Sequence, residues 1–218
     1  MALPRLRPGF KSRQPHSEPQ GAHPPDTSPL PAFLISKYLN AASQKHIMFL
    51  SDVDIRRAMK KGEIIFEPAI EDGQIGPGSV DLTLDNRWWF FKKANGKKID
   101  LSKTGWKDIM EEKEAKSIVL KPQQLCLGIT KEKITLADDI VGILEGRSRY
   151  ARMGLSIHIT SSFVQPGISN HQVLEIVNNS KYDYVIHEGM RITHIVFART
   201  QTPTSKPYRK FGEIARRQ

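Results

Sequence analysis

Cysteine is almost missing from this chain, since Cys126 is the only one among 218 residues. A single cysteine excludes a disulfide framework within the chain. It also excludes zinc sites that need two or three thiolates from one chain. The composition therefore fits a reducing compartment, and we predict a cytoplasmic protein without a zinc cofactor.

Long apolar runs are missing as well. Hydrophobic residues make up 39 % of the chain, which is within the range of soluble globular proteins. No run approaches the roughly 20 apolar residues of a membrane-spanning helix, so no membrane partner is expected. The length is sufficient for one domain with a real core and a tail.

An acidic surplus is also missing, because the formal net charge is +10. The basic surplus lies at the two ends: residues 1–47 carry six basic and two acidic side chains, and residues 206–218 carry five and one. The remaining residues 48–205 carry 22 and 20. A nucleic-acid-binding body with an overall basic surface is therefore not expected. A basic tail near a site can equally serve a small polyanionic substrate.

The first part of the chain differs from the rest. Eight prolines fall between Pro4 and Pro31, with few large apolar residues. Such a segment buries too little surface to offset its ordering entropy. Residues 1–47 are therefore predicted to be a disordered Pro-rich extension, or to precede a true start at Met48. A transit peptide is the less favoured alternative, because the prolines interrupt the amphipathic helix that it needs.

Residues 48–205 have the pattern of a single β domain. A helix is predicted over residues 51–61, where Ser51 can cap the first turn with Asp54 and Gly62 can end the helix, and a short one near residues 106–114. Aromatic residues 88–91 are expected in the core or at a subunit contact. Short strands broken by turn residues indicate an all-β sandwich or barrel. The predicted strands are residues 117–128, 139–145, 155–164, 172–178, 182–186 and 191–199.

Residues 145–178 carry the candidate chemistry. A cationic and hydroxyl cluster, Arg147-Ser148-Arg149, is followed at helical spacing by Arg152. Further along, Glu175 shares one strand face with Val173 and Val177, because strand side chains alternate. Each residue taken alone is most often an ordinary surface residue or a cap. Burial between two valines would raise the pKa of Glu175 towards the range of a proton shuttle.

The order of these motifs resembles the dCTP deaminase family, a branch of the trimeric dUTPase superfamily. Residues 146–155 are similar to the family pattern G-[RK]-S-S-L-[AG]-R-x-G-L, residues 164–167 to I-D-P-G, and residues 173–175 to V-L-E. The resemblance extends from Met48 to about Glu213 and is weakest over residues 92–116. It implies a dUTPase-like β-barrel or distorted jelly roll with a few short helices, assembled as a homotrimer.

The resemblance also implies roles for individual residues. Glu175 would shuttle protons, while Ser148 and Arg152 of a neighbouring subunit would help place the water and orient Glu175. Mg²⁺ would enter with the triphosphate, without a protein cage of its own. Residues 206–218 would form a short arm over the nucleotide. The residues expected to bind the nucleotide are Arg147, Ser148, Arg149, Tyr150, Ala151, Arg152, Gln165, Val173, Leu174, Glu175, Tyr208 and Lys210.

The activity implied by the resemblance is hydrolysis of dCTP to dUTP and ammonia. The zinc deaminase motif P-C-x-x-C is absent. Gln165 stands where the family and dUTPases have Asp, which weakens the alternative of a dUTP pyrophosphatase or a bifunctional deaminase and dUTPase. A second alternative is a non-catalytic nucleotide-binding regulator on the same fold. It is kept open by further departures at Thr83, Arg149 and His194.

Overall fold

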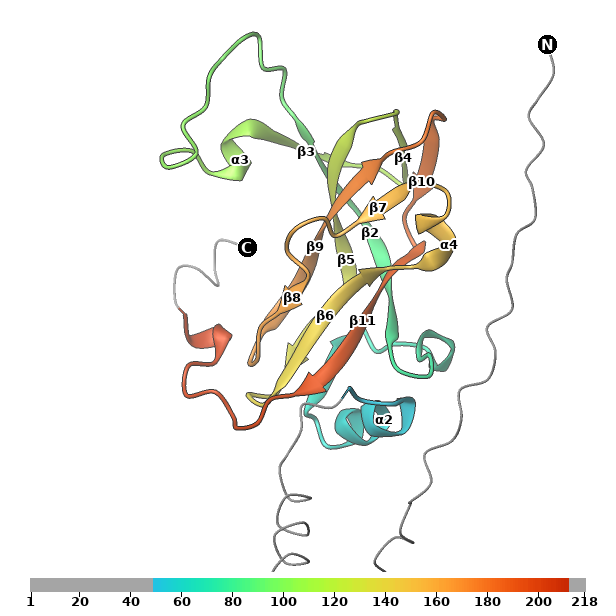
Figure 1. Cartoon of the computed structure of the whole chain (residues 1–218), viewed down its shortest axis with the longest axis vertical. Coiled ribbons are helices and arrows are strands. Elements are labelled where there is room, and N and C mark those ends of the chain that lie inside the picture. Colours follow the sequence, from blue (N-terminus) through green and yellow to red (C-terminus); the bar gives the residue numbers. More distant parts are fainter. Residues whose placement is uncertain (1–48, 212–218) are drawn as a thin grey trace, which may run out of the picture. The chain divides into compact units, whose positions relative to one another are not determined.

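The computed structural model describes residues 49–211 (Figure 1). The predicted Pro-rich extension over residues 1–47 lies outside the described residues, and so does the end of the predicted arm, residues 212–218. Within residues 49–211, no helix combines the length and apolar character needed to cross a bilayer.

The first element is the helix α2, Asp52–Lys60, and its start agrees with the sequence prediction. The hydroxyl of Ser51 accepts a hydrogen bond from the backbone N–H of Asp54, and the Asp54 carboxylate accepts one from the N–H of Ser51. This capping box satisfies donors that otherwise have no partner in the first helical turn. Ile55 and Ala58 face the core.

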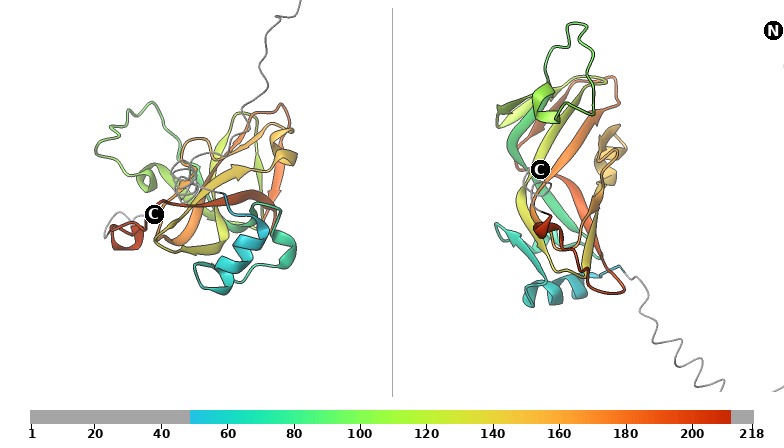
Figure 2. Two further views of the ribbon diagram at one scale, coloured as in Figure 1. Left: turned by 60° about the horizontal axis from the view of Figure 1, so that its bottom comes forward. Right: turned by 90° about the vertical axis from the view of Figure 1, so that its left-hand side faces the viewer.

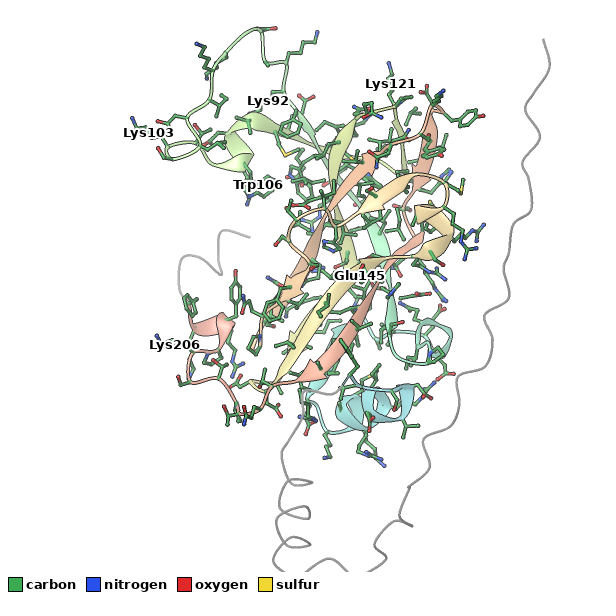
Figure 3. All side chains as sticks on the ribbon, in the orientation of Figure 1. Lys92, Lys103, Trp106, Lys121, Glu145 and Lys206 are labelled. Carbon is green, nitrogen blue, oxygen red and sulfur yellow. The ribbon has the colours of Figure 1, made fainter. Side chains whose placement is uncertain are left out.

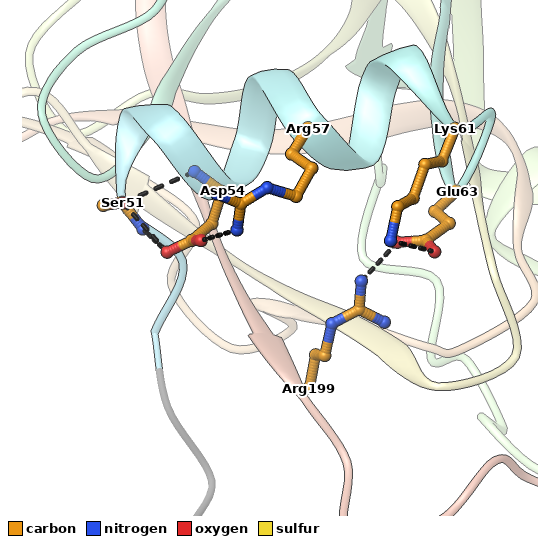
Figure 4. Close-up of polar contacts among 6 residues, drawn as sticks. All are labelled: Ser51, Asp54, Arg57, Lys61, Glu63 and Arg199. Atoms are coloured by element: carbon orange, nitrogen blue, oxygen red, sulfur yellow. Dashed lines mark hydrogen bonds and ion pairs between the residues drawn. The ribbon is translucent and has the colours of Figure 1, made fainter.

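The far end of α2 is joined to the last long strand. Lys61 and Arg199 both form ion pairs with the carboxylate of Glu63 (Figure 4). Arg199 also pairs with Asp139. Since Arg199 belongs to the strand β11, Arg191–Arg199, these contacts tie the end of the helix to the sheet.

Ser51→Ala is expected to lower the free energy of unfolding by about 1 kcal/mol, the usual cost of losing a side-chain N-cap. Urea denaturation at neutral pH measures it. Ser51→Asn is the matched control, because Asn caps helices as well as Ser does. Equal stability of the Ala variant and the natural chain would show that the capping box contributes nothing.

Most of the regular secondary structure is strand, so the predicted mostly β fold with few short helices is confirmed. A nine-stranded sheet has the path β7-β9-β5-β2-β11-β6-β8, with β1 added on β5 and β3 on β2, and a two-stranded sheet pairs β10 with β4. Figure 2 shows the strands curling, with α2 at one end of the domain. The strands are β1 Ile64–Glu67, β2 Val80–Phe91, β3 Met110–Glu114, β4 Ser117–Leu120, β5 Leu125–Leu136, β6 Ile140–Gly146, β7 Leu155–Ile157, β8 Phe163–Val164, β9 Ser169–Asn178, β10 Tyr184–His187 and β11.

The single strand predicted over residues 155–164 is wrong. The chain leaves the sheet after β7 and returns to it only at β8. The break is at His158, whose φ of 60° is incompatible with a continuing strand. The loop of residues 158–162 that results is the part of the chain that reaches Glu175.

The helix predicted near residues 106–114 is only half present. α3 spans Trp106–Ile109, and the chain then continues as β3, paired antiparallel with the end of β2. Pairing with β2 therefore overrides the local helical preference of a segment rich in Glu and Lys. Short helices remain at η1, Asp72–Gln74, α4, Ser148–Ala151, and η2, Tyr208–Lys210.

The aromatic run of residues 88–91 divides between core and surface. Trp88 is fully buried and Trp89 is 7 % exposed, so the core placement predicted for them is confirmed. Phe91, at the end of β2, is instead 55 % exposed. Trp89, Met110 and Ile129 form a small apolar cluster under α3, and this cluster supports one wall of the site described next.

Candidate active site

A cavity of about 600 Å³ opens between the sheet, α3 and η2. Its volume is in the range of sites that bind nucleotide-sized ligands. One wall comes from β9 and the loop of residues 158–162, and the other from the segment that leads into β3. Residues that line it include Phe91, Trp106, Ile109, Leu127, Ile159, Thr160, Ser161, Gln165, Asn170, His171, Val173, Glu175 and Tyr208.

Glu175 lies on the wall formed by β9 and is held there by three hydrogen bonds. One carboxylate oxygen accepts from the backbone N–H groups of Ile159 at 2.8 Å and Thr160 at 2.7 Å. The other oxygen accepts from the Thr160 hydroxyl at 2.6 Å. A carboxylate offers about four acceptor positions, so room remains for one further donor such as a water molecule.

The prediction that Glu175 has a raised pKa is wrong. Val173, Glu175 and Val177 do share one half-buried face, and burial does raise the pKa of the Glu175 carboxyl. The hydrogen bonds from Thr160 and Ile159, with the nearby His158, outweigh this effect and hold that pKa below its usual value. Glu175 is therefore a carboxylate at neutral pH and can accept a proton.

His158 lies directly behind this contact. Its backbone N–H donates to the backbone carbonyl of Glu175 at 3.0 Å. Among the described residues, neither ring nitrogen of His158 has a hydrogen-bond partner. Burial lowers the pKa of the imidazole to about 4, although the Glu175 charge acts in the opposite direction. His158 is therefore neutral at physiological pH.

The structure brings four of the predicted nucleotide-binding residues into the cavity, namely Gln165, Val173, Glu175 and Tyr208. Leu174 does not point there, because its side chain is fully buried in the core. Leu174 can therefore contact a ligand only through its backbone, or act on it indirectly by positioning Glu175. Lys210 is exposed on η2 and is not among the cavity residues.

The other predicted residues, from Arg147 to Arg152, do not line the cavity. They form α4 and its flanks, on the side of the sheet away from η2 (Figure 1). Arg147 pairs with Asp81 at 3.2 Å and donates to the backbone carbonyl of Arg191 at 2.9 Å. Arg149 lies 5.7 Å from the ring centroid of Tyr150. Ser148, Ala151 and Arg152 are exposed.

The beginning of the C-terminal arm docks on the turn that contains Gln165. The backbone N–H of Tyr208 donates to the carbonyl of Pro166, and that of Arg209 donates to the carbonyl of Gly167. Gly167 has a φ of 73°, and a Cβ atom there would meet the Pro207 side chain at 2.5 Å. Glycine is therefore required at this turn, and Tyr208 is held at the cavity edge.

Sequence reasoning missed several residues of the site. Among them are Ile159 and Thr160, whose backbone N–H groups donate to the Glu175 carboxylate. It also missed Trp106, which lies in the segment where the family resemblance is weakest. The one sequence feature that could have indicated the contact with Glu175 is the hydroxyl of Thr160, which precedes Ser161 and Ser162.

The only cysteine side chain, that of Cys126, does not line the cavity. Cys126 is fully buried, and burial raises the pKa of its thiol to about 12. Across residues 49–211, no group of three or more His, Cys, Asp or Glu side chains is arranged to hold a metal ion.

Comparison with known proteins gives consistent matches. The family model described as dCTP deaminase-like matches residues 49–200. The chain is 35 % identical over 163 residues to the "dCTP deaminase, dUMP-forming" of Methanosphaera stadtmanae, a match that covers 73 % of this chain and 83 % of that protein. It is 37 % identical to the "dCTP deaminase" of a Marinomonas species, with 75 % and 89 % covered.

A solved structure of 2'-deoxycytidine 5'-triphosphate deaminase from Agrobacterium tumefaciens shares the fold. Its TM-score is 0.57 at 18 % identity, and the match covers 71 % of this chain and 49 % of that one. The described domain thus spans about half of that solved chain.

Proposed function

Since the chain belongs to the dCTP deaminase-like family, we propose that it hydrolyses dCTP to dUTP and ammonia. The observation that carries this proposal is the position of Glu175. The carboxylate lies at the wall of a nucleotide-sized cavity, ionised, and keeps one acceptor position for water.

The proposed chemistry begins with water at the free acceptor position of Glu175. The carboxylate takes a proton from the water while the water oxygen bonds to C4 of cytosine. Glu175 then delivers that proton to the ring nitrogen N3. The proton of the new C4 hydroxyl is then passed to the amino group, the C4–N bond breaks, and ammonia leaves. Thr160 and Ile159 keep the carboxylate in place throughout.

The triphosphate requires cations, and among residues 49–211 no Lys or Arg side chain lines the cavity. Arg147, Arg149 and Arg152 lie outside the cavity lining, around α4. We propose that a homotrimer supplies them from a neighbouring subunit, with Ser148 and Arg152 reaching the water beside Glu175. Arg147 would keep its ion pair with Asp81 and meet phosphate only with its remaining donors.

Mixing two inactive variants tests the shared site. Glu175→Gln and Arg152→Ala are each expected to have little activity, whereas trimers reassembled from equal amounts are expected to recover about one quarter of natural activity. Three quarters of random trimers are hybrids, and each hybrid has one of three sites with both natural residues. Hybrid trimers verified by native mass spectrometry that remain inactive would contradict the shared site.

Mg²⁺ is proposed to arrive bound to the triphosphate rather than in a site of its own. Hard cations of this kind are usually held by substrate phosphates and one or two carboxylates. The proposal includes no zinc, since a single cysteine cannot supply the two or three thiolates of a deaminase zinc site. A cytoplasmic location remains our proposal, because the single cysteine suits a reducing compartment.

A bifunctional enzyme that continues to dUMP is the second candidate. Its support is that relatives such as those of Methanosphaera stadtmanae and Mycolicibacterium gilvum are named dUMP-forming. Gln165 lines the cavity but cannot act as a carboxylate towards a hydrolytic water. A simple deaminase therefore remains our first proposal.

One assay distinguishes these functions. The protein is incubated with dCTP and Mg²⁺, and ammonia, dUTP, dUMP and pyrophosphate are quantified. Ammonia with dUTP supports the deaminase, and ammonia with dUMP and pyrophosphate supports the bifunctional enzyme. Binding of dCTP without ammonia release would overturn catalysis in favour of a nucleotide-binding regulator.

A further inference from the structure

The segment of residues 92–109 forms one wall of the cavity but has no role in the chemistry proposed above. It leaves the sheet at the end of β2, extends outwards and returns through α3 into β3 (Figures 1 and 3). Trp106 and Ile109 of this segment line the same cavity as Glu175. Both strands that carry the segment are hydrogen-bonded to each other, with Phe91 opposite Met110, so its base is firmly placed.

Trp106 is the residue of this segment best suited to meet a ligand. Its indole packs edge to face on Trp89, with ring centroids 5.8 Å apart and an interplanar angle of 81°. The Lys107 ammonium lies 5.2 Å from the Trp106 ring centroid. Since Trp89 is itself almost completely buried, the indole of Trp106 rests on a rigid support.

The surroundings of Trp106 in the cavity match a flat, uncharged ring. Beside it the cavity wall is apolar, with Phe91, Ile109 and Leu127. Aromatic side chains bind nucleobases by stacking, and stacking tolerates any base because every base has a π face.

We propose that Trp106 is a substrate-positioning residue that stacks on the pyrimidine ring while C4 of that ring faces Glu175. The inference rests on the proposed function, because it takes dCTP as the ligand. Stacking would hold the ring in the plane in which water bound to Glu175 can attack C4. The contact is made in the ground state and in the transition state, so its loss acts mainly on KM.

The test compares Trp106→Leu and Trp106→Phe. Leu keeps an apolar side chain against Trp89 but removes the π face, and Phe retains a π face. Trp106→Leu is expected to raise KM for dCTP about tenfold with kcat within about twofold, in line with measured losses of base stacking, and Trp106→Phe is expected to remain close to the natural protein. Leu101→Ala, at a position 82 % exposed on the same segment, is the matched control.

A second readout is independent of turnover. Trp88 and Trp89 are buried and Trp106 is the more accessible of the three tryptophans, so bound dCTP is expected to quench its fluorescence. The titration is done in the Glu175→Gln background, where dCTP is not consumed. Quenching is expected to be lost in Trp106→Phe even though dCTP still binds by calorimetry.

The outcomes separate this inference from the proposed function. Natural KM and natural dCTP affinity in Trp106→Leu, in a protein that releases ammonia, would overturn the stacking role and leave the deaminase standing. An equal loss of affinity in the Leu and Phe variants at unchanged melting temperature would overturn it as well. If the natural chain binds dCTP but releases no ammonia, the proposed deaminase function is refuted. The dCTP affinities of the Trp106→Leu and Trp106→Phe variants would still decide whether Trp106 stacks on the base.

Discussion

Replacing Glu175 with Gln is expected to lower kcat for dCTP at least about 10²-fold, the usual order for loss of a general acid–base, with little change in dCTP affinity. Gln cannot take a proton from water at neutral pH, so the transfer to C4 loses its base. The deficit is expected in kcat and kcat/KM alike, because the missing interaction is made in the transition state. Steady-state ammonia release and calorimetric dCTP binding measure the two quantities.

Glu175→Gln can keep equivalents of the three hydrogen bonds that hold the side chain. The carboxylate oxygen that accepts from Ile159 and Thr160 can be replaced by the amide oxygen of Gln. The amide NH₂ can donate to the Thr160 hydroxyl in place of the oxygen that now accepts from it. All three contacts have an equivalent in the variant, so the fold and the cavity are expected to persist.

Thr160→Val is the matched control for this prediction. It removes the hydroxyl donor and leaves both backbone donors. Because hydrogen bonds from Thr160 hold the pKa of Glu175 down, the pKa is expected to rise and the acid limb of the kcat/KM profile to move to higher pH. If the Glu175→Gln variant turns over dCTP at close to the natural kcat, Glu175 is not the proton shuttle.

Acidification is expected to destabilise this protein through His158, by up to about 3 kcal/mol. Burial lowers the pKa of His158 from 6.5 to about 4 in the folded state. Between these two values the unfolded chain binds more protons than the folded one, so stability decreases as the pH falls from 6.5 towards 4. The pKa of Glu175 is also lowered in the folded state, and its contribution to stability is lost at still lower pH.

His158→Asn is the variant that tests this effect. Asn is among the residues that best tolerate the positive φ found at this position, and it does not titrate in this range. The free energy of unfolding, measured by urea denaturation at pH 7, 6, 5 and 4, is expected to depend less on pH in the variant. His187→Asn, at an exposed position of β10, controls for loss of a histidine. Identical pH slopes of the natural chain and His158→Asn would refute the effect.

Features that depend on residues close together in the sequence could be predicted from the sequence alone. The Ser51 cap follows from a residue type and a spacing of three, and the capping box is present. The shared face of Val173, Glu175 and Val177 follows from strand alternation. The turn of residues 165–167, on which the C-terminal arm docks, follows from Pro166 and Gly167, since few other residues suit its backbone. These features are set within a few residues of the chain.

Features that depend on distant residues were not accessible in this way. β3 forms where a helix was predicted, because residues 110–114 find the end of β2 as a partner. Arg147, predicted to bind phosphate, pairs with Asp81 of β2. Trp106 lines the cavity because α3 packs over Trp89. No local periodicity encodes such pairings.

The proton affinity of Glu175 illustrates the difference. The sequence alone determined that a carboxylate lies on a half-buried strand face, and burial by itself raises its pKa. Only the tertiary structure decided the outcome, because the chain leaves the sheet at His158 and brings Ile159 and Thr160 to the carboxylate. Hydrogen bonds from a loop 15 and 16 residues away in sequence outweigh burial, since the pKa depends on the sum of contacts in space.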